Sequence, residues 1–200
     1  MKIVLASNNR GKLAELHAMF APLGLELLSQ ADLGIPEAAE PYRTFVENAL
    51  AKARHAAQHS GLASVADDAG LCVDAFDGLP GVDTAFYAAQ FGYAKSDDNN
   101  VIALLEQMRN ITHRRAALVS TLVAVRSPQD PEPLIAVGRV TGEITREPLG
   151  SHGFGFDPVM WIPEFGKTFA QLPVDVKNAN SHRGRAARAM VALMRERWSL

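Results

Sequence analysis

The sequence contains a single cysteine, Cys72, among its 200 residues. One thiol cannot form an internal disulfide, and it excludes zinc sites built from several thiolates. Cys72 lies in the apolar run 71–73, which favours a packing role over that of a nucleophile. His152 and His182 are too few and too scattered for a catalytic zinc centre. We therefore expect a reducing, cytoplasmic environment and chemistry without thiolates.

Long apolar runs and a strong excess of one charge are also absent. No stretch approaches the ~18 apolar residues of a membrane span. The polar residues 8–12 interrupt the first apolar run too early for a signal peptide. The formal net charge is −2 with both signs interspersed, so the chain lacks the basic footprint of a protein that binds duplex nucleic acid. These absences favour a soluble protein whose partners are neither a membrane nor a nucleic acid polymer.

The first twelve residues combine a short apolar strand, a polar loop and the start of a helix. Residues 3–6 predict a buried strand, and Leu13, Leu16, Met19 and Phe20 recur at helical spacing. Free backbone N–H groups and the positive end of a helix dipole would face the loop between them. This arrangement predicts a phosphate site, and the simpler alternative is an ordinary helix capped by Asn8 or Asn9. The loop residues are Ser7, Asn8, Asn9, Arg10, Gly11 and Lys12.

Several familiar catalytic and nucleotide-binding motifs are missing. Lys12 is followed by Leu13, so the loop is not a Walker sequence, and one glycine is too few for the dinucleotide fingerprint. No G-x-S-x-G elbow or cysteine–histidine pairing indicates a covalent nucleophile.

Strand and helix patterns alternate along the chain, which predicts a mixed α/β fold. Thr44 and Glu47 form a potential capping box for a helix that ends before Gly61. The sequence 67–70 reads as a turn between two short strands. We expect strands at 3–6, 25–28, 64–66, 71–73, 116–125 and 133–140, a weakly helical stretch at 82–91, and helices at 12–20, 44–60, 97–109 and 183–198.

Three constellations could carry chemistry, and each also has a purely structural alternative. The first is Asp67 with Asp68, two adjacent carboxylates that repel each other and could be held by a cation. Magnesium favours one or two carboxylates together with substrate oxygens and water. The alternative is a turn whose acids are solvated. Neighbours on a strand point to opposite faces, so only one of the pair should reach an ion.

The second constellation is the glycine-rich aromatic loop 151–158, SHGFGFDP. Its phenylalanine rings could stack on a base and Asp157 could accept from base N–H groups, although the rings could equally belong to the core. The third is Lys177 with Ser181, His182 and Arg183. Cations in a first helical turn suggest an anion or an acceptor-rich ring in front of them, and a solvated basic helix is the alternative.

Seven motifs in order resemble the inosine triphosphate or non-canonical purine nucleoside triphosphate pyrophosphatase family, the RdgB/HAM1 type. Each motif is weak alone, but their order and spacing over nearly the whole chain are very specific. They are SNNRGK, FVENALAKA, ADDAGLCVDAFDGLPGV, ITREPLG, GFGFDP, GKTFAQL and K-x-x-x-SHRG.

The resemblance implies an elongated two-lobed α/β fold around a long central mixed sheet, formed by one domain over residues 1–200. It implies a magnesium-dependent homodimer that hydrolyses dITP, ITP and XTP to the monophosphate and pyrophosphate. Asp68 would be the general base and, with Glu40, a metal ligand, and Glu37 is a possible substitute for Glu40. Lys52 would be a further phosphate contact. The substrate-binding residues would be Ser7, Asn8, Asn9, Arg10, Gly11, Lys12, Ala69, Phe154, Gly155, Phe156, Asp157, Lys177, His182 and Arg183.

The chain departs from the family pattern at four positions. Ala69 stands where serine is common, and Phe86 stands where arginine is common. Gln171 replaces a common glutamate, and Asn180 replaces an aliphatic residue. These changes bear on substrate range and turnover more than on the reaction type. Two alternatives stay open: a Maf-like nucleotide hydrolase with shifted substrates, and a nucleotide-sensing protein without turnover.

Overall fold

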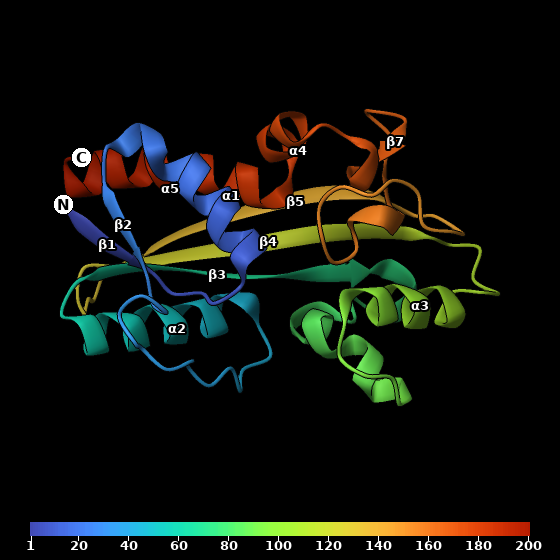
Figure 1. Ribbon diagram of the computed structural model, residues 1–200, viewed down its shortest axis with the longest axis horizontal. Coiled ribbons are helices and arrows are strands. Elements are labelled where there is room, and N and C mark those ends of the chain that lie inside the picture. The colour runs from blue at the N-terminus through green and yellow to red at the C-terminus, as the bar shows by residue number, and fades with distance from the viewer. The chain divides into compact units, whose positions relative to one another are not determined.

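The computed structural model describes all residues from Met1 to Leu200. It contains a seven-stranded mixed sheet with the order β2-β1-β3-β4-β5-β6-β7, flanked by helices (Figure 1). This architecture confirms the predicted mixed α/β class. The strands are β1 Lys2–Leu5, β2 Glu26–Ser29, β3 Ala63–Val73, β4 Arg115–Val125, β5 Leu134–Ile144, β6 Met160–Ile162 and β7 Lys167–Thr168, and the α-helices are α1 Arg10–Phe20, α2 Phe45–Ser60, α3 Asp97–Gln107, α4 Val174–Asn180 and α5 His182–Trp198.

The chain forms two compact units. The first contains residues 1–68, 120–138 and 182–200, and the second contains residues 69–119 and 139–181. Strands β3, β4 and β5 contribute residues to both units. None of the helices has both the length and the apolar character needed to cross a bilayer.

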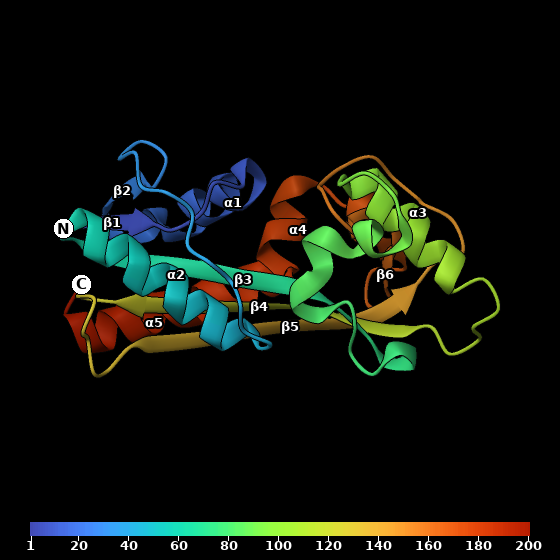
Figure 2. The same cartoon turned by 90° about the horizontal axis from the view of Figure 1, so that it is seen from below.

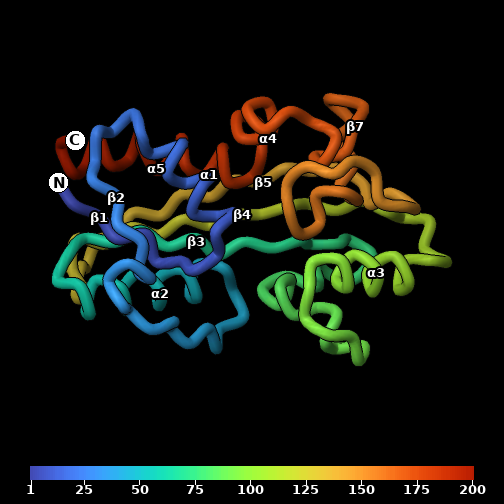
Figure 3. Tube along the Cα trace, in the orientation of Figure 1, coloured from blue at the N-terminus to red at the C-terminus, as the bar shows by residue number.

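In the first unit, helices cover both faces of the sheet. Helices α1 and α5 pack together on one face, over a core that includes Leu5, Leu16 and Met190. Helix α2 covers the other face with small residues such as Ala49, Ala53 and Ala56, which belong to the same core as Val4. Figure 2 shows the α2 side from below, and Figure 3 shows the two chain ends at the same end of this unit.

Parallel pairing of β1 with β3 places the first loop beside the two acids. Leu5, the last residue of β1, is opposite Val65, and β3 continues beyond this pair to Asp67 and Asp68. The chain leaves β1 through residues 6–9 and enters α1, so the helix N-terminus begins at the carboxyl end of β1. In α/β sheets this end of the parallel strands is where ligands bind.

The predicted hairpin at residues 64–73 is wrong, because these residues form one continuous strand of 11 residues. The acids that suggested a turn are buried in its middle, where Asp67 is 2% exposed and Asp68 is 6% exposed. Their charges are balanced by cations from other elements, which local sequence does not reveal. The strand therefore continues through a sequence that is typical of a turn.

Most other predicted elements are confirmed with small changes at their ends. Asn9 is the N-cap of α1, and Thr44 is the N-cap of α2, with its side chain accepting from the Glu47 N–H. The weakly helical stretch is the 3-10 segment η3, Gly81–Phe91. Helix α4 is a short element of seven residues that the sequence analysis did not predict.

The second unit has its own apolar core. Leu71, Leu104 and Met160 belong to it, together with Phe156 of the aromatic loop and Phe169. The remaining 3-10 segments are η1 Ala21–Leu23, η2 Asp74–Phe76, η4 Asp157–Val159 and η5 Phe169–Gln171.

Candidate active site

The loop between β1 and α1 is exposed and shaped by its own side chains. The Asn9 side chain accepts from the Lys12 N–H at 3.0 Å, and the Ser7 hydroxyl accepts from the Asn9 N–H at 3.2 Å. Asn8 donates to the Glu37 carboxylate at 2.9 Å. The first N–H groups of α1, at Arg10 and Gly11, have no acceptor within the helix. They give the loop donors and a positive dipole end.

Asp67 is buried at the centre of a network of cations. Lys12 of α1 and Arg183 of α5 each approach its Oδ2 at 3.1 Å, and the Ser120 hydroxyl donates to its Oδ1 at 2.5 Å. Burial raises the pKa of a carboxyl group, but here the nearby charges of Arg183 and Lys12 outweigh it and hold the pKa of Asp67 well below its usual range. Asp67 is therefore a fixed anion that positions two cations. Arg183 also pairs with the buried Glu15 of α1.

Asp68 faces a different environment. The Lys52 ammonium of α2 donates to its Oδ1 at 2.8 Å and to Glu40 Oε2 at 2.7 Å. Its other oxygen, Oδ2, is buried without a hydrogen-bond partner. Burial is the largest influence on this carboxyl group and raises its pKa to about 6, although Lys52 opposes the shift. A carboxylate with a pKa near neutrality and one unpaired oxygen is suited to accept a proton.

Lys12 connects the two acids in one cluster. It pairs with Asp67, and its charge also lowers the pKa of Asp68. An ammonium group has three donors, so a single pairing leaves Lys12 able to bind another anion. The lysine side chain is 18% exposed. The first unit thus brings the basic loop and the acid Asp68 to one place.

The acids of this cluster fit a divalent cation bound together with a substrate. Glu40 and Asp68 are close enough to share one ammonium group, and Oδ2 of Asp68 is unsatisfied. No group of three or more potential ligands from histidine, cysteine, aspartate and glutamate is present. Two carboxylates without further protein ligands suit magnesium, which keeps waters and takes substrate phosphate oxygens.

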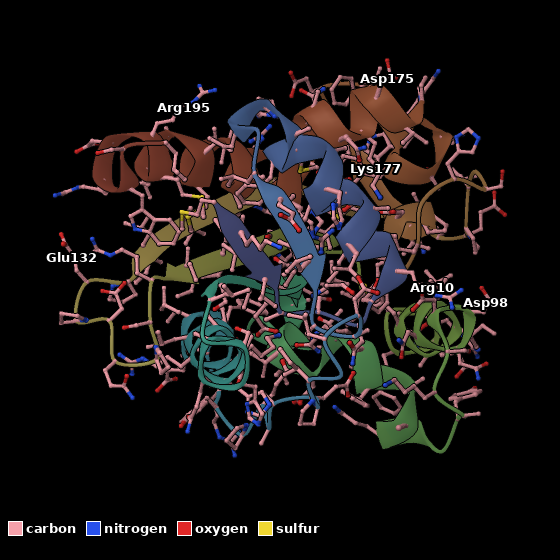
Figure 4. The ribbon with its side chains drawn as sticks, turned by 60° about the vertical axis from the view of Figure 1, so that its left-hand side comes forward. Arg10, Asp98, Glu132, Asp175, Lys177 and Arg195 are labelled. Carbon is pink, nitrogen blue, oxygen red and sulfur yellow. The ribbon has the colours of Figure 1, made fainter.

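The aromatic loop of the second unit surrounds a buried ion pair. Lys177 of α4 binds Asp157 Oδ2 at 2.6 Å, and its ammonium lies 4.8 Å from the Phe154 ring centroid. The same Asp157 oxygen accepts from the Phe154 N–H at 2.9 Å. In Figure 4 Asp175 lies on the outer side of α4 and Lys177 on the opposite side. The loop therefore presents a fixed carboxylate and an aromatic ring close to a cation.

Glycines give this loop its tight conformation. Gly153 and Gly155 have φ values of 79° and 62°, in the left-handed region that favours glycine. A Cβ atom on Gly153 would collide with the Asp157 carboxylate. Asp97, the first residue of α3, accepts from the Gly155 N–H at 2.9 Å.

The other predicted site residues lie in several environments. His182 and Arg183 are buried at the start of α5, so the alternative of a solvated basic helix is wrong for these two residues. Ala69 follows Asp68 in β3. Phe86 is 53% exposed, and the Lys95 ammonium lies 4.0 Å from its ring centroid, so this position has a neighbouring cation although it lacks arginine.

Sequence reasoning missed three residues that hold these clusters. Glu15 is a buried acid of α1, and Ser120 is a hydroxyl residue within the apolar strand β4. A polar residue within an apolar strand is a signal that could have identified Ser120. Asp97 follows the helix cap Ser96 and has no comparable signal, because acids are common in a first helical turn.

Comparison with known proteins identifies the family. Residues 3–193 match the Ham1 family. The chain belongs to the Ham1 family. A relative named dITP/XTP pyrophosphatase from Albidiferax ferrireducens is 83% identical over 99% of this chain and 100% of its own length. Another of that name from Polaromonas naphthalenivorans is 78% identical over 99% of this chain and 100% of its own length.

Solved structures of similar proteins have the same fold. A HAM1 protein from Coxiella burnetii superposes with a TM-score of 0.90 at 38% identity, covering 98% of this chain and 99% of its own. A nucleoside-triphosphatase, dITP/XTP pyrophosphatase, from Mycobacterium abscessus gives a TM-score of 0.75 at 42% identity, covering 97% and 99%. Membership of the Ham1 family confirms the resemblance inferred from the seven motifs.

Proposed function

We propose that this protein hydrolyses non-canonical purine nucleoside triphosphates, namely dITP, ITP and XTP, to the nucleoside monophosphate and pyrophosphate. Its relatives are named dITP/XTP pyrophosphatases, and the chain is an enzyme of this nucleoside triphosphate pyrophosphatase class. The observation that carries the proposed mechanism is the pair of acids in β3. Asp67 is held as an anion by two cations, while Asp68 has a pKa of about 6 and an unpaired oxygen.

In this proposal the first loop and its cations bind the triphosphate. The N–H groups at the start of α1 and the ammonium of Lys12 are donors for phosphate oxygens. Lys52, which binds Glu40 and Asp68, would be a further phosphate contact. Phosphoryl chemistry depends mainly on positioning and on neutralising charge, and these groups supply both.

Asp68 acts as the general base on the attacking water. Its oxygen Oδ2 is the proton acceptor that the structure leaves unsatisfied. Glu40 and Asp68 would hold Mg²⁺, and Glu40 is favoured over Glu37 because it shares Lys52 with Asp68 while Glu37 accepts from Asn8. When bound, the magnesium ion neutralises phosphate charge and orients the water.

The aromatic loop recognises the purine in this proposal. Phe154 offers a ring face, and Phe156 is 4% exposed and anchors the loop in the core. Asp157 and Lys177 provide a fixed acceptor and a fixed cation. A 6-oxo purine accepts hydrogen bonds where adenine donates them, so an unmatched amino group would cost roughly 1–3 kcal/mol.

His182 and Arg183 supply donors from the start of α5. Arg183 pairs with Asp67 and Glu15, which supports a role in positioning the phosphate cluster in addition to the substrate contact implied by the family. Ala69 can contribute only its backbone N–H.

We further propose that the enzyme is a cytoplasmic homodimer. Its substrates belong to the nucleotide pool, and one cysteine agrees with a reducing compartment. Three exposed apolar residues of the second unit are candidates for contacts between copies, namely Leu79, Phe86 and Phe91 at 58%, 53% and 40% exposure.

A panel of nucleoside triphosphates tests the proposal. We expect pyrophosphate release from ITP, dITP and XTP with Mg²⁺, and little release from ATP or without the metal. Release from other nucleotides in preference to these three would favour a hydrolase with shifted substrates. Binding of ITP without any release would favour a sensing role and contradict the proposal.

A further inference from the structure

A basic pocket of the second unit lies outside both clusters described above. Its volume is about 270 Å³, and three of its six lining residues are arginines in a chain whose net charge is −2. The lining residues are Leu105, Glu106, Met108, Arg109, Arg114 and Arg146.

Arg114 forms the fixed wall of this pocket. Its guanidinium donates to the carbonyl groups of Ile144 at 2.6 Å, Thr145 at 2.7 Å and Met108 at 2.9 Å. These bonds satisfy carbonyl groups at the end of α3 and at the end of β5, which gives Arg114 a structural role. Carbonyl oxygens carry no net charge, so these bonds leave the positive charge of Arg114 in place.

Arg109 and Arg146 have no such structural role. Both are exposed, and neither side chain has an ion pair or a hydrogen bond within the chain. Burial and the charge of Arg146 together lower the pKa of Arg114, so two like charges lie close together. Glu106, the acid among the lining residues, accepts from the Tyr93 hydroxyl at 2.7 Å. The pocket therefore combines Arg114, which its hydrogen bonds hold in place, with Arg109 and Arg146, whose side chains are free to bind an anion.

We propose that this pocket binds a small oxyanion of the phosphate class. The guanidinium groups of Arg109 and Arg146 can bind phosphate with paired hydrogen bonds, while Arg114, whose N–H groups mostly bind carbonyl groups, contributes its charge. An anion would also relieve the repulsion between Arg114 and Arg146. The volume lies just below the ~300–1,000 Å³ typical of small-molecule sites, which favours phosphate or pyrophosphate over a whole nucleotide. This site is independent of the proposed function, because none of its residues belongs to the two clusters.

Titration followed by nuclear magnetic resonance tests this site locally. The backbone amide of Met108 and the Nε–H of Arg114 report on the pocket, so binding of the same anions by the first loop does not confuse the readout. Phosphate, pyrophosphate and a purine nucleoside monophosphate are titrated separately. We expect saturable shifts with phosphate or pyrophosphate that weaken as salt is added, because exposed charges are screened.

Two variants decide the outcome. The double variant Arg109→Gln, Arg146→Gln keeps the structural Arg114, and we expect at least tenfold weaker binding. Arg195→Gln is the matched control, since Arg195 is an exposed arginine of α5 in the first unit (Figure 4), and its binding should equal wild type. Absence of saturable shifts, equal binding by the double variant, or shifts only with the nucleoside monophosphate would overturn the proposal.

Discussion

Asp67 and Asp68 are neighbours in sequence with opposite electrostatic environments. Asp67 points to Lys12, Arg183 and Ser120, and Asp68 points to Lys52. The alternation of side chains along β3 separates them, as expected for adjacent strand residues. One acid therefore stays ionised at all moderate pH values, while the other can exchange a proton near neutrality.

Titration of the Asp68 carboxyl carbon provides a first test. We expect a midpoint near pH 6 in metal-free protein, because burial disfavours the ionised form. Added Mg²⁺ should move the midpoint lower, since a cation favours the carboxylate. The unfolded chain loses this proton at a lower pH, so the contribution of Asp68 to folding stability should fall as pH rises from about 4 to about 6. A midpoint near 4 without metal, or one that Mg²⁺ leaves unchanged, would contradict this assignment.

At this scale the sequence revealed the acids but not their partners. Ser120, Arg183 and Glu15 lie far along the chain from the residues they bind, and nothing local links Ser120 to Asp67. The family motifs identified Lys12 and Asp68 as site residues, and the structure brings these two together. Only the folded chain shows that Arg183 holds Asp67.

At the scale of elements, the first turn of α5 lies directly against strand β5. A Cβ atom at Gly138 would collide with the backbone of His182 and Ala186. The close approach of these two elements carries Arg183 to Asp67. A glycine at this strand position is therefore required by packing rather than by a turn.

Gly138→Ala tests this contact. We expect a loss of about 1–3 kcal/mol in the free energy of unfolding, measured with urea, because backbone atoms must move to admit the methyl group. Val137→Ala is the matched control, since Val137 is 58% exposed on the other face of β5, and it should change stability by at most about 0.5 kcal/mol. Equal stability of the two variants would show that α5 does not rest on Gly138.

Helices and strands were predicted correctly where the signal lies in neighbouring residues. The prediction failed where the structure depends on residues far away in the sequence. The caps at Asn9 and Thr44 were visible because a cap and its helix are adjacent in sequence. Strand β3 was mistaken for a hairpin because its buried acids resemble turn residues until their cations are known. Helix α4 was missed because seven residues are too few for a clear helical period.

At the scale of the whole molecule, two compact units share strands β3, β4 and β5. Each of these strands continues from one unit into the other without interruption. Unfolding of either unit would therefore cut three strands of the other short. We therefore expect the chain to unfold in one cooperative step.

The two tryptophans report on this cooperativity. Trp161 belongs to the second unit and Trp198 to the first. Trp161→Phe and Trp198→Phe each leave one reporter, and the fluorescence midpoint in urea should coincide with the circular dichroism midpoint for each variant. Separate midpoints for fluorescence and dichroism within one variant would mean that the units unfold independently.

The fold class was predictable from alternating strand and helix patterns. The family resemblance predicted the enzyme class, a nucleoside triphosphate pyrophosphatase. The resemblance implied two lobes, but the segments that make up each unit and the basic pocket were not predictable, because both depend on packing between distant segments. Nothing in the local sequence distinguishes the three arginines of this pocket from other exposed arginines. Only the fold places Arg109, Arg114 and Arg146 around one pocket.

The most direct measurement is the turnover number of Asp68→Asn with ITP and Mg²⁺. This change is nearly isosteric and removes the proton acceptor, so we expect near-complete loss of pyrophosphate release with the circular dichroism spectrum of the folded protein retained. A folded variant that keeps more than a tenth of wild-type kcat would have lost less than about 1.4 kcal/mol of barrier lowering. That result would contradict the role of Asp68 as general base.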